Sequence, residues 1–143
     1  MDSKDSRIFQ YLLEHGRDKI SDISKTLDIP RATVYERIQG MVRDGIIQKF
    51  TIIPDYKAIG LPVVSFIFVA FNPNADVTQR QLADKISKFR EVEEVYIVTG
   101  EWDMLVKVRL QSVEEVGNFV LDKLRGIRGV EKTETIAVFS VVK

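Results

Sequence analysis

The first third of the chain has apolar residues at the spacing of short amphipathic helices. Side chains that recur at i, i+3, i+4 and i+7 share one face of a helix and can pack on a common core. Three such helices are predicted, separated by Gly16 and by Asp28-Ile29-Pro30, and ended by Gly45. Their apolar faces are Ile8, Tyr11 and Leu12; Ile23 and Leu27; and Val34, Ile38, Met41 and Val42. Three short helices with tight turns predict a helix-turn-helix module.

After Gly45 the periodicity changes. The stretch IIQKFTII, Ile46–Ile53, has the β-branched content of a strand, which would add a wing to the helices. The following stretch PDYKAIGLP contains two prolines together with Asp55 and Gly60, and such residues interrupt regular structure. This stretch therefore marks a boundary between two domains.

Beyond residue 60, strand-like runs alternate with helical ones. The predicted strands are Leu61–Phe71, Val92–Val98, Met104–Leu110 and Val130–Val142. Capping boxes of Asp76 with Gln79 and of Ser112 with Glu115 are expected to begin the two helices. The order β-α-β-β-α-β is that of the ferredoxin-like unit. The predicted fold class is α+β: a (winged) helix-turn-helix domain at 1–50, a connector at 51–60, and a ferredoxin-like domain at 61–143.

The predicted strands are apolar on both faces. In a ferredoxin-like unit both helices cover one face of the sheet, so the other face should be polar if it meets water. Both alternating sets along Leu61–Phe71 are apolar instead, and Val130–Val142 repeats this pattern. We therefore predict that a second subunit covers the free face. The alternative is that residues 46–60 fold back over it.

Composition narrows the class of protein. The chain has 143 residues, no cysteine, and 21 Lys+Arg balanced by 21 Asp+Glu. No apolar run reaches the roughly 20 residues that span a bilayer, and the charged start MDSKDSR has no signal core, so we expect a cytoplasmic protein without a membrane partner. The lack of cysteine excludes disulfides and thiolate metal sites, and no metal or cofactor is expected. Because the net charge of the chain is zero, any DNA binding must depend on a local patch of residues and not on the overall charge.

The segment PRATVYERIQGMVRDGIIQKF, Pro30–Phe50, has an outer face suited to DNA. On a recognition helix, the exposed side chains of the first two turns face base edges, where arginine matches guanine and the methyl groups of threonine and alanine meet thymine. The expected reading residues are Arg31, Ala32, Thr33, Tyr35, Glu36 and Arg37. Ser21 and Lys25 join them from the preceding helix, Lys25 as a phosphate contact. The alternative is a solvated helix in a small bundle.

The stretch ATVYERIQGMVRDGIIQKFT, followed by an α/β half that contains Gly-x-Trp-Asp, resembles the Lrp/AsnC family of transcription regulators, also called feast/famine regulatory proteins. The resemblance covers nearly the whole chain. It implies double-stranded DNA as a partner, homodimers joined through the ferredoxin-like halves, and higher assemblies such as octamers of four dimers. Pro30 departs from the family pattern, because a serine that caps the helix is common at this position.

The only tryptophan of the chain stands at the tip of a predicted hairpin, VTGEWDMLVKV. The resemblance implies that this loop lies between dimers and receives a small effector, usually an amino acid. Backbone amides beside Gly100 can hold a carboxylate, Asp103 or Glu101 can pair with an ammonium group, and Trp102 can exclude water. The expected effector site is Thr99, Gly100, Glu101, Trp102 and Asp103. The resemblance also implies Thr133 and Thr135, because they stand on the last strand at positions similar to residues that line the pocket in this family. The alternative is that Trp102 anchors an interface and Asp103 braces the hairpin.

Two other classes of protein compete with a regulator. Some decarboxylases of haem-type biosynthesis are similar in fold and act through histidines, but this chain has one histidine, His15, at a helix end where an imidazolium complements the helix dipole. We therefore expect no enzyme activity. The other alternative is an architectural DNA-binding protein without an effector. Discrete footprints on DNA would indicate a regulator, and uniform protection would indicate an architectural role.

Overall fold

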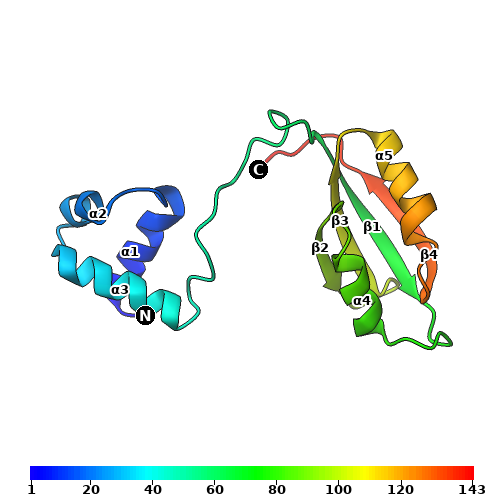
Figure 1. Ribbon diagram of the computed structural model, residues 1–143, viewed down its shortest axis with the longest axis horizontal. Helices are drawn as coiled ribbons and strands as arrows, with labels where there is room; N and C mark the ends of the chain where they lie inside the picture. The colour runs from blue at the N-terminus through cyan, green and yellow to red at the C-terminus, as the bar shows by residue number, and fades with distance from the viewer. The chain divides into compact units, whose positions relative to one another are not determined.

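The computed structural model describes residues 1–143, which form two compact units, Met1–Ile53 and Pro54–Lys143 (Figure 1). The first unit contains α1 (Ser3–Glu14), α2 (Ile20–Leu27) and α3 (Arg31–Arg43). The second contains β1 (Val63–Phe71), α4 (Gln79–Ser87), β2 (Val92–Ile97), β3 (Met104–Leu110), α5 (Val113–Asn118), η1 (Phe119–Leu124) and β4 (Val130–Ala137). No helix is long and apolar enough to cross a membrane.

The helical unit closes on a small apolar core, which confirms the three predicted helices and their apolar faces except at Val42, which is exposed. Its fully buried members are Ile8, Ile23, Ile29, Val34, Ile38 and Met41. Helix α1 begins at a capping box in which Asp2 and Asp5 each accept the backbone N–H of the other. Helix α2 begins at Ile20, after the extended Lys19, and no side chain caps its start.

The predicted strand over Ile46–Ile53 is not formed. The backbone N–H groups of Ile46 and Ile47 donate to the carbonyl of Met41, and Ile47 packs against the helical core. The rest of this segment has no strand partner, and Ile52 and Ile53 are almost fully exposed. A strand needs a neighbour to accept and donate its backbone hydrogen bonds, and this chain offers none here. The β-branched pattern was therefore insufficient, and the helical unit has no wing.

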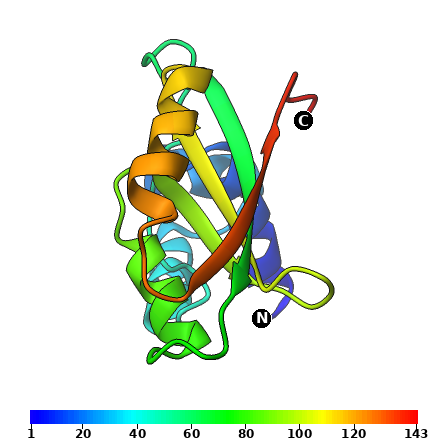
Figure 2. The same ribbon diagram turned by 90° about the vertical axis from the view of Figure 1, so that its right-hand side faces the viewer.

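The second unit is an antiparallel sheet in the order β2-β3-β1-β4, with α4 and the continuous α5–η1 helix on one face (Figure 2). This is the predicted ferredoxin-like arrangement. The core lies between the sheet and the helices, and includes Ile67, Val69, Leu82, Ile86, Met104, Val106, Val108 and Leu124. Strand β4 ends at Ala137, which pairs with Ser65, and so it is shorter than the predicted strand to Val142. One further hydrogen bond, from the N–H of Val138 to the carbonyl of Val64, continues the contact with β1.

The helix starts of this unit differ in detail from the predicted ones. The capping box of α4 is made by Thr78 and Gln81 rather than by Asp76 and Gln79, and Asp76 pairs with Arg128 instead. Ser112 does cap α5 by accepting the N–H of Glu115 at 3.2 Å. The Glu115 carboxylate accepts the N–H of Gln111, one residue before the cap, instead of the N–H of Ser112 that a complete capping box would use.

The outer face of the sheet, opposite the helices, is partly covered by the chain itself. Tyr56 stacks over the guanidinium of Arg109, with 3.6 Å between the Arg109 Cζ and the ring centroid. Val64 is buried on this face, whereas Phe66 is only half-buried and its neighbour Ile136 on β4 is 46% exposed. The predicted alternative, in which the connector folds back over this face, is therefore true only near Tyr56. The apolar surface around Phe66 and Ile136 is not covered by the chain.

Candidate functional site

Helices α2 and α3 meet through a tight three-residue turn. Asp28 adopts a left-handed backbone with φ of 53°, and the N–H of Ile29 donates to the carbonyl of Ser24, which is a Schellman-type helix ending. Ile29 is buried, and it locks the turn onto the helical core. Pro30 stands before α3 and its side chain gives the first-turn amides no acceptor. These amides are left free at the exposed start of α3.

One stripe of α3 faces away from the helical core. Val34, Ile38 and Met41 are buried at i, i+4 and i+7, which fixes the opposite side of the helix as the outward one. The exposed residues of the helix are Arg31, Ala32, Tyr35, Glu36, Gln39, Val42 and Arg43, and Thr33 is half-buried at the edge. Gln39 and Arg43 continue the outward stripe of Ala32 and Glu36 at helical spacing. Both residues lie beyond the first two turns of the helix, to which the predicted DNA-reading surface was confined.

Arg37 does not point outward with the other candidates. Its guanidinium forms ion pairs with Asp2 and Asp5 at the start of α1, and its side chain is one-third exposed. These hydrogen bonds to two carboxylates raise the pKa of Arg37 above its ordinary value. The structure thus gives Arg37 a role in joining α3 to α1. From α2, Lys25 is exposed and Ser21 is half-buried one turn before it, so the two share a helix face.

The loop between β2 and β3 projects at one end of the sheet (Figure 2). The N–H of Val98 donates to the carbonyl of Asp103 and closes the loop at 2.9 Å. Gly100 has φ of 109°, a conformation that side chains rarely adopt, and Thr99 and Glu101 are exposed beside it. The predicted hairpin is confirmed, with these three residues at its tip.

Asp103 is tied to the end of strand β1. One of its carboxylate oxygens accepts the N–H of Phe71 at 2.7 Å, its own N–H donates to the carbonyl of Val69, and its carbonyl accepts from the side chain of Gln79. Each of these bonds holds the hairpin to a neighbouring element. Asp103 therefore braces the hairpin, as the alternative prediction stated, and this uses one of its two carboxylate oxygens.

Trp102 lies on the outer face of the sheet. Its ring packs on Phe68, with centroids 5.7 Å apart, and the ammonium of Lys132 lies 5.1 Å from its centroid. Thr133 and Thr135 pair with Val69 and Ile67, which belong to the helix-covered core. Directly paired residues share a face, so within one chain the two threonines and Trp102 lie on opposite faces of the sheet. The structure does not bring Thr133 and Thr135 to the loop of the same chain.

Both halves of the chain match known families of regulators. Residues 64–143 match the Lrp/AsnC ligand binding domain, and residues 1–61 match the family described as sugar-specific transcriptional regulator TrmB. An HTH-type transcriptional regulator of Pyrococcus abyssi is 47% identical over 143 residues, covering 100% of this chain and 95% of the relative.

Solved structures of low sequence identity share the whole fold. An AsnC family transcriptional regulator from Agrobacterium tumefaciens superimposes with a TM-score of 0.92 at 22% identity, over 100% of this chain and 93% of that one. A transcriptional regulator from Neisseria meningitidis, solved in complex with L-Met, gives 0.90 at 23% identity, over 100% and 92%. The helix-turn-helix unit, the ferredoxin-like unit and these matches define a transcriptional regulator with a ligand-binding domain. The chain belongs to the Lrp/AsnC family.

Proposed function

We propose that this regulator reads specific DNA sequences with α3 and responds to an amino acid held at the loop between β2 and β3. The observation that carries the first part is the exposed surface of α3, which presents Arg31, Tyr35 and Glu36 on a helix fixed by its buried residues. A helix held in this way can enter a major groove with its first turns against base edges. Ser21 and Lys25 on α2 then approach the DNA backbone.

Arg31 is the residue that we assign to a base contact on α3. It is exposed at the first helical position, and it has no ion pair within the chain, in contrast to Arg37. A bidentate contact of its guanidinium with guanine contributes about 1–3 kcal/mol of discrimination against other bases. Ala32 and Thr33 complete the edge of this surface with methyl groups that can meet thymine.

The DNA-reading role is tested by footprinting and by binding to single-base variants of the protected site. We expect discrete protected sites, and we expect Arg31→Ala to lose about 1–3 kcal/mol of binding free energy at one base position only. Arg80→Ala, on the exposed surface of α4, is the matched control and should bind as the wild type does. Uniform protection of all DNA would contradict sequence-specific reading and favour the architectural alternative.

The amino-acid response is proposed from the chemistry of the loop and the family to which the chain belongs. Gly100 presents backbone amides at an exposed turn, and these can hold a carboxylate group. The second oxygen of Asp103, or the exposed Glu101, can accept an ammonium group. Trp102 and Lys132 stand beside the loop. The site becomes complete where a second subunit contributes Thr133 and Thr135, in a homodimer or in an octamer of four dimers.

A titration of Trp102 fluorescence with each of the twenty amino acids tests this response, because the chain has one tryptophan and the signal has one source. We expect a saturable change with one or a few amino acids. Asp103→Asn keeps an acceptor for the N–H of Phe71 but removes the charge, so it should abolish the change without unfolding the loop. If no amino acid changes the emission of an intact oligomer, Trp102 has an interface role only.

A further inference from the structure

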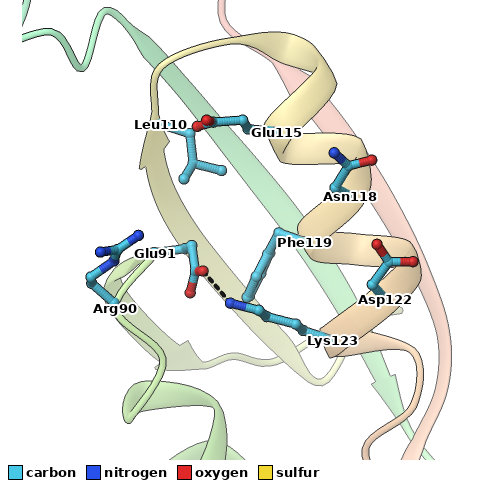
Figure 3. A pocket seen from close by; sticks show the side chains of 8 residues that line it. All are labelled: Arg90, Glu91, Leu110, Glu115, Asn118, Phe119, Asp122 and Lys123. Atoms are coloured by element: carbon cyan, nitrogen blue, oxygen red, sulfur yellow. Dashed lines mark hydrogen bonds and ion pairs between the residues drawn. The ribbon is translucent and has the colours of Figure 1, made fainter.

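A groove separates the α5–η1 helix from the turn that leads out of α4 into β2 (Figure 3). Its volume is about 210 Å³, enough for a molecule the size of several waters. It lies where β2 begins and β3 ends, so it is at the opposite end of the hairpin from Trp102. The groove and the proposed amino-acid site therefore lie at opposite ends of β2 and β3, in which each residue adds about 3.3 Å.

At the wall of this groove, one oxygen of a buried carboxylate has no hydrogen-bond donor. The side chain of Glu91 is only 10% exposed. Its Oε1 accepts from the ammonium of Lys123, which reaches across the groove from η1 (Figure 3). Its Oε2 is buried without a partner, and no other buried side-chain oxygen or nitrogen of the chain is in this state. An unpaired buried acceptor is costly, so this oxygen calls for a donor.

The opposite wall of the groove is an irregular helical turn. Phe119–Leu124 is π-helical, and the N–H of Arg125 donates to the carbonyl of Val120, five residues back. Such turns are rare and occur often at functional sites. This turn supplies Phe119 and Lys123 to the groove. The unpaired oxygen and the widened turn are independent features, and both belong to residues that line the groove.

We propose that the groove binds a small primary amine with an aliphatic stem. An ammonium group offers N–H donors to Glu91 Oε2, and the half-buried Glu115 supplies a second carboxylate at the inner wall. Leu110 and Phe119 are buried and form an apolar floor for the stem. Asp122 stands exposed at the rim, where it meets the second ammonium of a diamine.

Other ligand chemistries fit these residues less well. The inner wall carries the two carboxylates, which repel an anion, while Lys123 is already paired with Glu91 and Arg90 is exposed. No group of three or more His, Cys, Asp or Glu side chains in the chain could hold a metal ion. An organic cation with N–H donors is the class that meets both the unpaired oxygen and the apolar floor.

Calorimetric titration of the full chain with n-butylamine, 1,4-diaminobutane and butyrate tests this inference. We expect saturable binding of both amines and none of butyrate. Glu91→Gln should weaken amine binding about tenfold or more, because it removes the charged acceptor. Asp122→Asn should remove only the advantage of the diamine over the monoamine. Asp76→Asn, an exposed carboxylate paired with Arg128 outside the groove, is the control and should change nothing.

Several outcomes would overturn the inference. They are the absence of saturable heat with either amine at millimolar concentration, equal binding of butyrate, and amine binding that Glu91→Gln leaves unchanged. If Glu91→Gln does not fold, as judged by thermal melting, Glu115→Gln takes its place because its amide oxygen still accepts the N–H of Gln111. Unchanged amine binding by that variant would then reject the site.

Discussion

At the scale of single residues, Asp103 combines two roles that the sequence presented as alternatives. One carboxylate oxygen accepts the backbone N–H of Phe71, and the other has no partner of its own within the chain. A carboxylate held in this way is oriented before any ligand arrives, which reduces the entropy that binding must overcome. The bracing role therefore supports the proposed ligand role of the same side chain.

We expect Asp103→Ala to lower the free energy of unfolding of the ferredoxin-like unit by about 1–3 kcal/mol, because the N–H of Phe71 loses its acceptor. Asp103→Asn retains an acceptor and should cost clearly less. Urea denaturation followed by Trp102 fluorescence measures both changes. Equal stability of the alanine variant and the wild type would show that the Phe71 bond contributes nothing.

Arg37 illustrates a role that the position in a helix alone does not reveal. Its guanidinium is paired with two carboxylates of the α1 capping box, so we expect Arg37→Ala to weaken DNA binding equally on all sequences. Exposed ion pairs of this kind contribute about 0.2–1 kcal/mol, so the loss of stability should be small. Binding to a set of single-base variants measures this. A loss confined to one base position would show that Arg37 leaves its ion pair and contacts that base.

At the scale of elements, the periodicity of apolar residues predicted every helix and every strand of the sheet. Local patterns of this kind depend only on which side chains face the core. The strand at Ile46–Ile53 was wrong because strand formation depends on a partner, which the pattern does not contain. The caps of α1 and α4 were missed because more than one Asp, Ser or Thr residue stands near each helix start, and backbone geometry selects among them. Nothing in the sequence around Glu91 indicated that its side chain is buried, because the burial results from packing against a helix that is distant in the sequence.

The capping box of α1 makes the helical unit sensitive to acid. The hydrogen bond from the N–H of Asp5, and then the one from Arg37, lower the pKa of Asp2 below its ordinary value of 3.8. A lowered pKa in the folded state gives stability that is present above 3.8 and is lost as the pH falls through the folded value.

We therefore expect Asp2→Asn, which keeps a side-chain acceptor for the cap but has no titrating charge, to melt below the wild type at about pH 5. The gap between their melting temperatures should narrow as the pH approaches about 2. Thermal melts followed by helical circular dichroism measure this. A gap that stays constant across this range would exclude the ionised carboxylate as the cause.

At the scale of the whole molecule, the outer face of the sheet is the main candidate for a subunit interface. We expect Ile136→Glu to dissociate the proposed homodimer, because Ile136 is 46% exposed on this face and a buried charge without a partner is costly. Leu121→Glu is the matched control, since Leu121 is 62% exposed on η1 and away from this face. Sedimentation equilibrium measures the mass of both. An unchanged mass for Ile136→Glu would place the interface elsewhere.

The stacking of Tyr56 on Arg109 has a consequence for how a dimer searches DNA. Ile47 is held by the helical unit and Tyr56 by the sheet, so residues 48–55 limit the distance between these two anchor points. Eight residues span at most about 28 Å when fully extended. In the proposed dimer, so short a linker keeps the second DNA-binding unit at a high effective concentration near the DNA once the first has bound. A longer linker of glycine and serine would lower this effective concentration, and the two units would then bind DNA weakly and almost independently.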